Sequence, residues 1–226
     1  MDADGLFIDD NSPDGTGEVL DALAAQNPRL KILHRPGKLG IGTAHQAGIA
    51  YAYDHDYDLL ITLDADFTHS PNNIPSLIRH LGNSDVAVGS RYMQKHSLAG
   101  WNLMRKFLTW LAHVLTRLLL DMKYDSTGAF RVYRLDRIPR ELFSLVESRG
   151  YSFFFESLHL LNFNKFKIEE MPIDLPPRTY GTSKMSYKDA LKSLEILLTT
   201  FFRRLFMRDS FRVHPARTSE ERKVNK

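Results

Sequence analysis

Two aspartates separated by one residue directly follow a short apolar segment. Residues 59–63 read Leu-Leu-Ile-Thr-Leu and run into Asp64 and Asp66. An apolar run of this length predicts a buried strand, and open α/β sheets bind their ligands at the carboxyl ends of strands. Two hard oxygen ligands placed this closely suit Mg²⁺ or Mn²⁺ carrying a diphosphate. The alternative is a solvated loop, in which aspartate is common, and the pair alone does not decide between the two.

A second pair of carboxylates, Asp9 and Asp10, follows the apolar residues 6–8. Carboxylates at a strand end can accept hydrogen bonds from the base or the ribose of a nucleotide. The alternative is a capping or Asx-turn role in the polar segment 11–16, which leads into a helix. The residues alone leave both interpretations open, although Asp14 fits the structural role better.

Basic side chains that could bind phosphate occur at further positions. Arg91 follows an apolar segment and can make a two-point contact with phosphate or carboxylate; the alternative is an ion pair with Asp64 or Asp66. Arg178 and Lys184 flank a glycine-containing segment that could close over a diphosphate and an acceptor phosphate. The alternative for that segment is a mobile basic loop.

Other polar features favour plainer interpretations. Arg105 and Thr109 lie one turn apart on an expected helix, and the sequence alone favours a solvated flank for Arg105. The glycine-rich residues 37–42 lack the spacing of a phosphate-binding loop, so we expect a turn before the next helix. Arg131 and Arg134 are expected to be surface charges.

Bulk composition limits the classes of function. The chain has 226 residues, 43% of them hydrophobic, and no cysteine, which excludes disulfides and thiolate metal sites. Residues 1–66 carry 12 acidic and 4 basic side chains, and residues 67–226 carry 15 and 26. The basic part could face the phosphates of lipid or nucleic acid. Because no nucleic-acid motif is present, we expect no nucleic-acid partner.

The elements that must position these residues alternate along the chain. We expect strands at 6–8, 30–33, 59–63, 85–88, 130–133 and 167–172, and helices at 17–26, 43–53, 74–81, 100–122, 153–161 and 187–207. This alternation predicts an α/β fold with a mostly parallel central sheet and flanking helices. We expect one domain over residues 1–207 and a basic, disordered tail over residues 208–226.

Two of the expected helices could touch a membrane surface. Residues 190–207 are amphipathic, rich in Leu and Phe, and end beside Arg203, Arg204 and Arg208, which is typical of an interfacial helix. Residues 100–122 offer a second such surface, and the alternative is that both helices pack on the core. No apolar stretch is long enough to span a bilayer, and the acidic N-terminus is unlike a signal peptide. We therefore expect a peripheral protein.

Several motifs resemble one family of enzymes. Asp9–Thr16, Leu63–Asp66 and Gly89–Tyr92 resemble family 2 glycosyltransferases, which have the GT-A nucleotide-diphospho-sugar transferase fold. Asp125–Arg131 and Arg178–Ser186 are similar to the polyprenyl-phosphate (dolichol-phosphate) mannose synthases within that family. The resemblance runs from about residue 6 to about residue 206, with the motifs in the family's order.

The resemblance implies a role for each candidate residue. It implies that Mg²⁺ or Mn²⁺ is held by Asp64 and Asp66, with Thr68 as a further ligand where the family often has Gln. The implied donor-nucleotide residues are Asp10, Asp64, Asp66 and Lys184. The implied acceptor-phosphate residues are Arg91, Arg105, Thr109 and Arg178. The implied catalytic residues are Asp66, Arg91 and Arg178.

The resemblance also implies an activity and a location. The expected reaction is inverting transfer of a hexose, mannose from GDP-mannose, to a polyprenyl or dolichyl phosphate at the cytoplasmic face of a membrane, with a separate membrane-anchoring subunit as a further expected partner. A UDP-sugar donor is the first alternative. The second is a non-catalytic relative, because the family opens with a strand and a nucleotide-binding loop that have no counterpart before residue 6. Loss of that strand would expose the edge of its neighbour.

Overall fold

The computed structural model describes residues 3–95, 97–176 and 186–213. The strands are β1 (Gly5–Asp9), β2 (Leu30–His34), β3 (Leu59–Thr62), β4 (Val86–Ser90), β5 (Arg131–Arg134) and β6 (Ile168–Pro172). The helices are α1 (Thr16–Gln26), α2 (Ile41–Asp54), α3 (Ile74–Leu81), α4 (Leu103–Leu120), α5 (Arg140–Ser144), α6 (Phe153–Phe163) and α7 (Tyr187–Phe206), with short 3-10 helices η1 (Pro71–Asn73) and η2 (Arg208–Phe211). The expected elements are present, and α5 is an additional one.

The strands form two sheets rather than one. A four-stranded sheet has the order β3-β5-β4-β6, while β1 and β2 form a separate parallel pair. In the larger sheet β3, β4 and β6 share one direction, and β5 runs antiparallel between β3 and β4. The mostly parallel sheet of the α/β prediction is therefore confirmed, with β5 as the exception.

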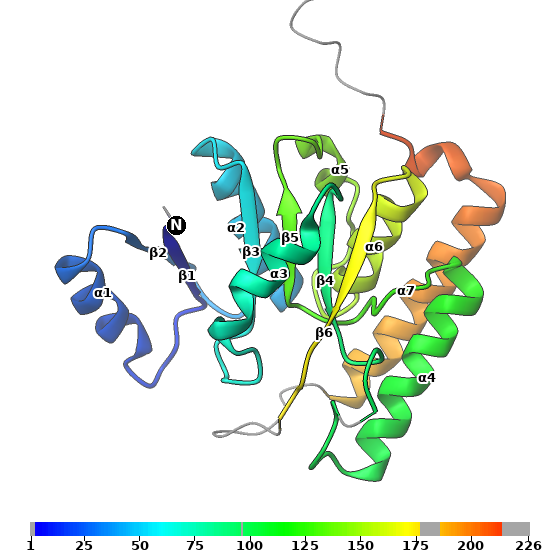
Figure 1. Ribbon diagram of the computed structural model, residues 1–226, viewed down its shortest axis with the longest axis horizontal. Coiled ribbons are helices and arrows are strands. Elements are labelled where there is room, and N and C mark those ends of the chain that lie inside the picture. The colour runs from blue at the N-terminus through cyan, green and yellow to red at the C-terminus, as the bar shows by residue number, and fades with distance from the viewer. Residues whose placement is uncertain (1–2, 96, 177–185, 214–226) are drawn as a thin grey trace, which may run out of the picture.

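The break between the sheets lies next to β3. Within the described residues β1 and β3 are both edge strands. Helix α2 contacts both β1 and β3 and connects the small sheet to the large one. Figure 1 shows β1, β2 and α1 together at one end of the molecule, and α4 and α7 side by side at the other.

The core lies on both faces of the larger sheet. Side chains alternate between the faces along a strand, so Val86 and Val88 of β4 pack with α6, while Ala87 packs with α3. Figure 1 shows α3 and α6 on opposite faces of this sheet. Because β4 is buried along its whole length, the residues at its carboxyl end are held by a rigid element.

The glycine-rich segment before α2 packs tightly against another loop. Gly40 has a φ of 103°, and a Cβ there would lie 2.4 Å from the carbonyl oxygen of Arg149. A Cβ on Gly42 would lie 2.8 Å from the carbonyl oxygen of Gly150. The backbone N–H of Thr43 donates to the Arg149 oxygen. Close backbone contact therefore explains these glycines, in agreement with a turn.

A substitution at Gly40 tests this contact. Gly40→Ala should lower the free energy of unfolding by about 2–4 kcal/mol, because it combines an unfavourable φ with overlap of backbone atoms. Gly37→Ala is the matched control, since a Cβ there meets no atom within 4 Å; it should be neutral or slightly stabilising. Urea unfolding measures both, and equal stabilities of the two variants would contradict the packing.

The first residues of the expected disordered tail form a short helix. Residues 208–211 form η2 instead of belonging to a disordered tail, because Phe211 is buried and its ring packs against His159 and Phe163, with centroids 5.3 and 5.6 Å away. The guanidinium of Arg203 lies 4.9 Å from the Phe211 centroid. One apolar residue in a polar segment was too weak a signal to predict this. Residues 214–226 lie outside the described residues.

Candidate active site

The turn after β3 is organised by its own side chains. The hydroxyl and backbone N–H of Thr68 both donate to Oδ1 of Asp66, at 2.6 and 3.1 Å. The backbone N–H of Asp64 donates to Nδ1 of His69 at 3.0 Å. Both acidic residues of the predicted pair are therefore held in place by neighbours within five residues.

Thr68 orients the second aspartate. The resemblance implies that it is a cation ligand, but its hydroxyl donates to Asp66 and the residue is buried. Thr68 therefore orients Asp66, and its hydroxyl oxygen keeps lone pairs for the cation contact that the resemblance implies. Groups that orient a metal ligand in this way contribute substantially to metal affinity.

His69 fixes the first aspartate and is a site residue that the sequence did not single out. Its ring is buried, stacks on Phe130 at 5.4 Å, and has Nδ1 3.8 Å from Oδ2 of Asp64. Burial lowers the pKa of His69, against the raising effect of the two aspartates. A neutral ring fits its contact, because Nδ1 accepts a hydrogen bond and carries no proton. Its position three residues after Asp66 was the available signal.

The donor set at this turn fits a hard divalent cation. Mg²⁺ in phosphate-transfer sites is commonly held by one or two carboxylates together with the substrate's phosphates, and Asp64 and Asp66 supply two. Across the described part of the chain, no group of three or more His, Cys, Asp or Glu side chains could hold a metal ion. Asp64 and Asp66 alone would leave the remaining coordination positions of such a cation to phosphate and water.

A substitution at Thr68 checks the orienting role. Thr68→Val removes the hydroxyl and should weaken Mn²⁺ binding in the presence of a nucleoside diphosphate by about 10–100-fold. Thr199→Val is the matched control, because the Thr199 hydroxyl donates to a carbonyl oxygen within α7. Paramagnetic resonance of free Mn²⁺ measures both affinities. An unchanged affinity in Thr68→Val would show that Asp66 does not need this hydrogen bond.

Arg91, at the end of β4, is held by a buried carboxylate. Its Nε lies 2.7 Å from Oδ2 of Asp125, and its Nη2 donates to Oδ1 at 3.2 Å and to Thr127 at 3.1 Å. The carboxylate hydrogen-bonded to Arg91 is thus Asp125, whereas the sequence suggested Asp64 or Asp66; the charge of Asp64 also acts on Arg91. Burial raises the pKa of Asp125, but the charge and hydrogen bonds of Arg91 outweigh it and hold that pKa below its usual value.

The anchoring of Arg91 leaves one end of its guanidinium for a ligand. Nε and Nη2 are engaged, while Nη1 has no hydrogen-bond partner among the described residues. The backbone N–H of Asp125 donates to Glu170 of β6 at 2.8 Å, so the carboxylate is itself fixed. This arrangement suits a preorganised contact with phosphate.

Arg131 is buried, which corrects the expectation of a surface charge. Its guanidinium donates to the carbonyl oxygens of Ser126, Gly128 and Phe154 and to the hydroxyl of Ser157. Inward-facing carbonyls need donors, and a guanidinium supplies five N–H groups in one plane. Arg131 thus holds the loop that carries Asp125. Arg134, by contrast, is half-buried and donates to the carbonyls of Gly82 and Ser84.

Asp10 forms a two-point ion pair that the sequence did not predict. Nε and Nη2 of Arg35 donate to Oδ1 and Oδ2 of Asp10 at 2.6 and 2.7 Å, and Nη1 donates to Thr43 at 2.8 Å. Asp9 accepts the backbone N–H of Ser12, which together with the nearby His34 lowers its pKa. Asp9 therefore stabilises the turn, and Asp10 is fixed by Arg35 at the end of β1.

The acceptor-side candidates lie on α4. The hydroxyl of Tyr92 donates to the carbonyl of Thr109 at 2.9 Å, which joins α4 to the residue after Arg91. The guanidinium of Arg105 lies 3.5 Å from the ring centroid of Trp101. Arg178 and Lys184 lie outside the described residues.

Comparison with known proteins identifies the family. The family model described as glycosyl transferase family 2 matches residues 2–138. The undecaprenyl-phosphate mannosyltransferase of Micrococcus luteus is 34% identical over 186 residues, covering 82% of this chain and 76% of that protein. The polyprenol monophosphomannose synthase of Mycolicibacterium smegmatis is 35% identical over 184 residues, covering 80% and 69%. The fold, the carboxylate turn and these matches agree: the chain belongs to glycosyl transferase family 2.

Proposed function

We propose that this glycosyltransferase moves mannose from GDP-mannose to a polyprenyl phosphate. The observation that carries the proposal is the Asp64–Asp66 turn at the end of β3, held by Thr68 and His69. The two relatives are named for mannose transfer to undecaprenyl phosphate and for polyprenol monophosphomannose synthesis. Their names support the acceptor and the sugar, and the identity of the nucleotide belongs to the proposal.

The reaction needs few groups from the protein. An oxygen of the acceptor phosphate attacks the anomeric carbon while the bond from that carbon to the donor diphosphate breaks, which inverts the configuration. Asp64 and Asp66 would hold Mg²⁺ or Mn²⁺, which when bound neutralises charge on the leaving diphosphate. Arg91 would present Nη1 to a phosphate. The acceptor phosphate is ionised at neutral pH, so positioning and electrostatics would supply most of the rate enhancement.

The remaining candidates complete the proposed site. Asp10, fixed by Arg35, would accept a hydrogen bond from the donor nucleotide. Arg105, Thr109 and Arg178 would lie along the acceptor phosphate, and Lys184 beside the donor. A UDP-sugar remains the alternative donor, because a carboxylate can accept an N–H from guanine or from uracil.

The test is transfer of radiolabel from GDP-mannose and, separately, UDP-glucose into an organic-extractable polyprenyl phosphate in the presence of Mg²⁺ or Mn²⁺. The proposal expects product from GDP-mannose that requires the added acceptor. If product formed from UDP-glucose and not from GDP-mannose, the donor would be UDP-glucose instead. Absence of product with both donors, from protein shown to be folded by circular dichroism, would favour the non-catalytic alternative.

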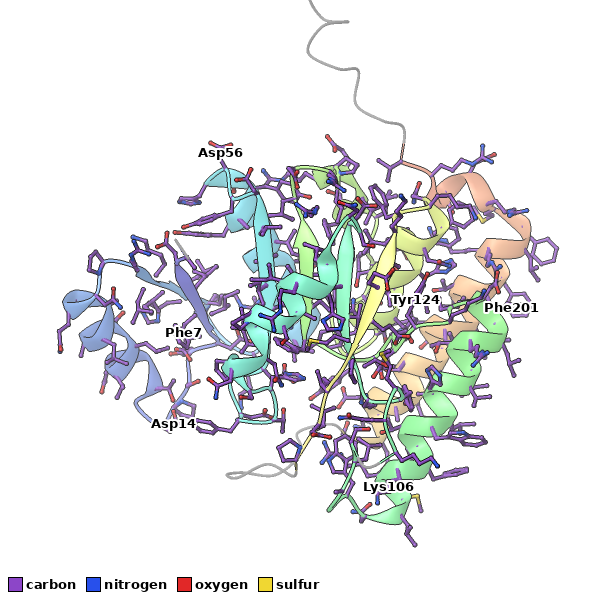
Figure 2. All side chains as sticks on the ribbon, in the orientation of Figure 1. Phe7, Asp14, Asp56, Lys106, Tyr124 and Phe201 are labelled. Carbon is purple, nitrogen blue, oxygen red and sulfur yellow. The ribbon has the colours of Figure 1, made fainter. Side chains whose placement is uncertain are left out.

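We further propose that α4 and α7 touch the membrane surface from which the acceptor is drawn. Their exposed apolar side chains include Leu103, Phe107, Trp110 and Leu118 on α4 and Leu191, Leu198, Phe202 and Phe206 on α7. Figure 2 shows side chains projecting outward from both helices, away from the sheet. A patch of this kind marks an interaction surface. The same surface could instead bind a separate membrane-anchoring subunit.

The charges and lengths of these helices bear on the mode of contact. Arg203 and Arg204 form ion pairs with Glu147 and Asp121. These pairs within the protein neutralise part of the positive charge that we expected at lipid headgroups. None of the helices in the described ranges is both long and apolar enough to cross a bilayer. A peripheral position at the cytoplasmic face of that membrane is a separate part of the proposal.

A charge placed in the apolar surface should weaken lipid binding. Leu198→Asp on α7 is expected to reduce binding to anionic vesicles by about 10-fold or more, because it removes the apolar contact of the exposed part of Leu198 and places a negative charge against anionic lipid. Leu23→Asp on α1 is the matched control, since Leu23 is 47% exposed and Leu198 is 41% exposed. Vesicle sedimentation measures both. If the two variants lost vesicle binding equally, the effect would come from the added charge alone.

A further inference from the structure

Phe67 combines an unfavourable backbone conformation with exposure of an aromatic ring. Its φ is 63°, in the left-handed region that aromatic residues rarely adopt. Its neighbours in the turn, Thr68 and His69, are buried, whereas Phe67 is 69% exposed. The turn therefore holds an aromatic side chain toward solvent directly after Asp66.

The hydrogen bonds of the turn explain why the conformation persists. Two bonds from Thr68 to Asp66 and one from Asp64 to His69 fix the residues on both sides of Phe67. Such outliers are maintained where the surroundings over-determine them, and they cluster at ligand-binding sites. Glycine would adopt this φ without strain, so the backbone conformation alone does not favour phenylalanine at this position.

The neighbourhood of Phe67 indicates which part of a ligand the ring could meet. Asp66, the preceding residue, would bind the donor diphosphate through the cation, and the hexose is bonded to that diphosphate. The C–H groups on one face of a hexose ring form an apolar surface, which an aromatic ring can cover while the hydroxyls stay in water. The adjoining side chains Asp64, Asp66 and Thr68 are polar and offer no such surface.

We propose that the ring of Phe67 contacts the hexose of the nucleotide-sugar donor and positions it for attack. This inference rests on the proposed function, because it requires a diphosphate held at Asp64 and Asp66. Phe67 would bind the sugar but not the nucleoside diphosphate, and that difference separates a sugar contact from a general effect on the turn.

The test compares the affinities of GDP-mannose and GDP, and of UDP-glucose and UDP, by calorimetry with Mg²⁺. Phe67→Ala and Phe67→Gly should lower the affinity for the sugar nucleotide by about 10-fold, as expected for loss of one aromatic contact. They should lower the affinity for the free nucleotide by less than about 2-fold. Phe67→Tyr should keep the wild-type affinities. Leu23→Ala removes an exposed apolar side chain from α1 and should change neither affinity.

Other results would overturn the proposal in distinguishable ways. Equal weakening of sugar nucleotide and free nucleotide would show that the substitutions disturb the turn. Unchanged affinities in Phe67→Ala, with normal binding by the wild type, would exclude the contact and leave the proposed function intact. No binding of either sugar nucleotide by the folded wild type would remove both proposals.

Discussion

Replacement of Asp125 by alanine is expected to lower the free energy of unfolding by about 3–5 kcal/mol, because removal of one partner from a buried ion pair leaves the other charge unpaired. Asp125 is fully buried and accepts the backbone N–H, Nε and Nη2 of Arg91. Urea unfolding at neutral pH gives the value. We also expect a lower rate of sugar transfer, since Arg91 would no longer be held at the end of β4.

The matched control is the ion pair between Arg140 and Asp54, in which about half of each side chain is exposed. Asp54→Ala should cost about 0–1 kcal/mol, because solvent screens exposed pairs. Comparable losses in Asp54→Ala and Asp125→Ala would contradict the distinction between the two pairs.

The same carboxylate predicts a dependence on pH. The pKa of Asp125 lies below its usual value in the folded protein. A group with a lowered folded pKa stabilises the fold above its unfolded pKa, near about 4, and this contribution is lost as pH falls through the folded value. The stability difference between wild type and Asp125→Ala should therefore be full at pH 7 and decrease only in strong acid. A difference that disappears already between pH 7 and pH 5 would contradict the lowered pKa.

Asp66→Asn should reduce the rate of sugar transfer by about 100–1000-fold, the size of effect seen when one group that stabilises developing charge is removed. The side-chain oxygen of asparagine can still accept the two hydrogen bonds from Thr68, so the turn should keep its shape while the negative charge is lost. The transfer assay gives kcat/KM, and thermal unfolding checks that the fold is retained.

Asp56→Asn provides the control for loss of a single surface charge. Asp56 has a φ of 56°, a conformation that asparagine tolerates, and it lies in the turn between α2 and β3. Its transfer rate should remain within about 2-fold of wild type, because exposed charges far from the reacting groups contribute little. If Asp66→Asn retained a similar rate, the carboxylate would not be part of the catalytic site.

Local signals were sufficient to predict the strand and the carboxylates at the centre of the candidate site. The apolar residues 59–63 and the two aspartates that follow are contiguous, so a strand with carboxylates at its end could be predicted without tertiary information. The turn chemistry of Asp14 was equally local: its carboxylate accepts the N–H and the hydroxyl of Thr16.

Long-range partners could not be predicted in the same way. Asp125 lies 34 residues from Arg91, and Arg35 lies 25 residues from Asp10, so no spacing rule relates them. Arg131 is buried because its guanidinium donates to carbonyl oxygens that face inward, whereas its residue type predicts exposure. The antiparallel direction of β5 has no signature in four residues, because strand direction depends on the connections made elsewhere in the sheet.

Calorimetric titration of the wild-type protein with GDP-mannose, with Mn²⁺ and then with excess chelator, tests most directly whether Asp64 and Asp66 bind a divalent cation together with the donor diphosphate. We expect binding with Mn²⁺, a large loss of affinity on chelation, and the same weak affinity in Asp66→Asn under both conditions. Equal affinity with and without the cation in the wild type would contradict the account.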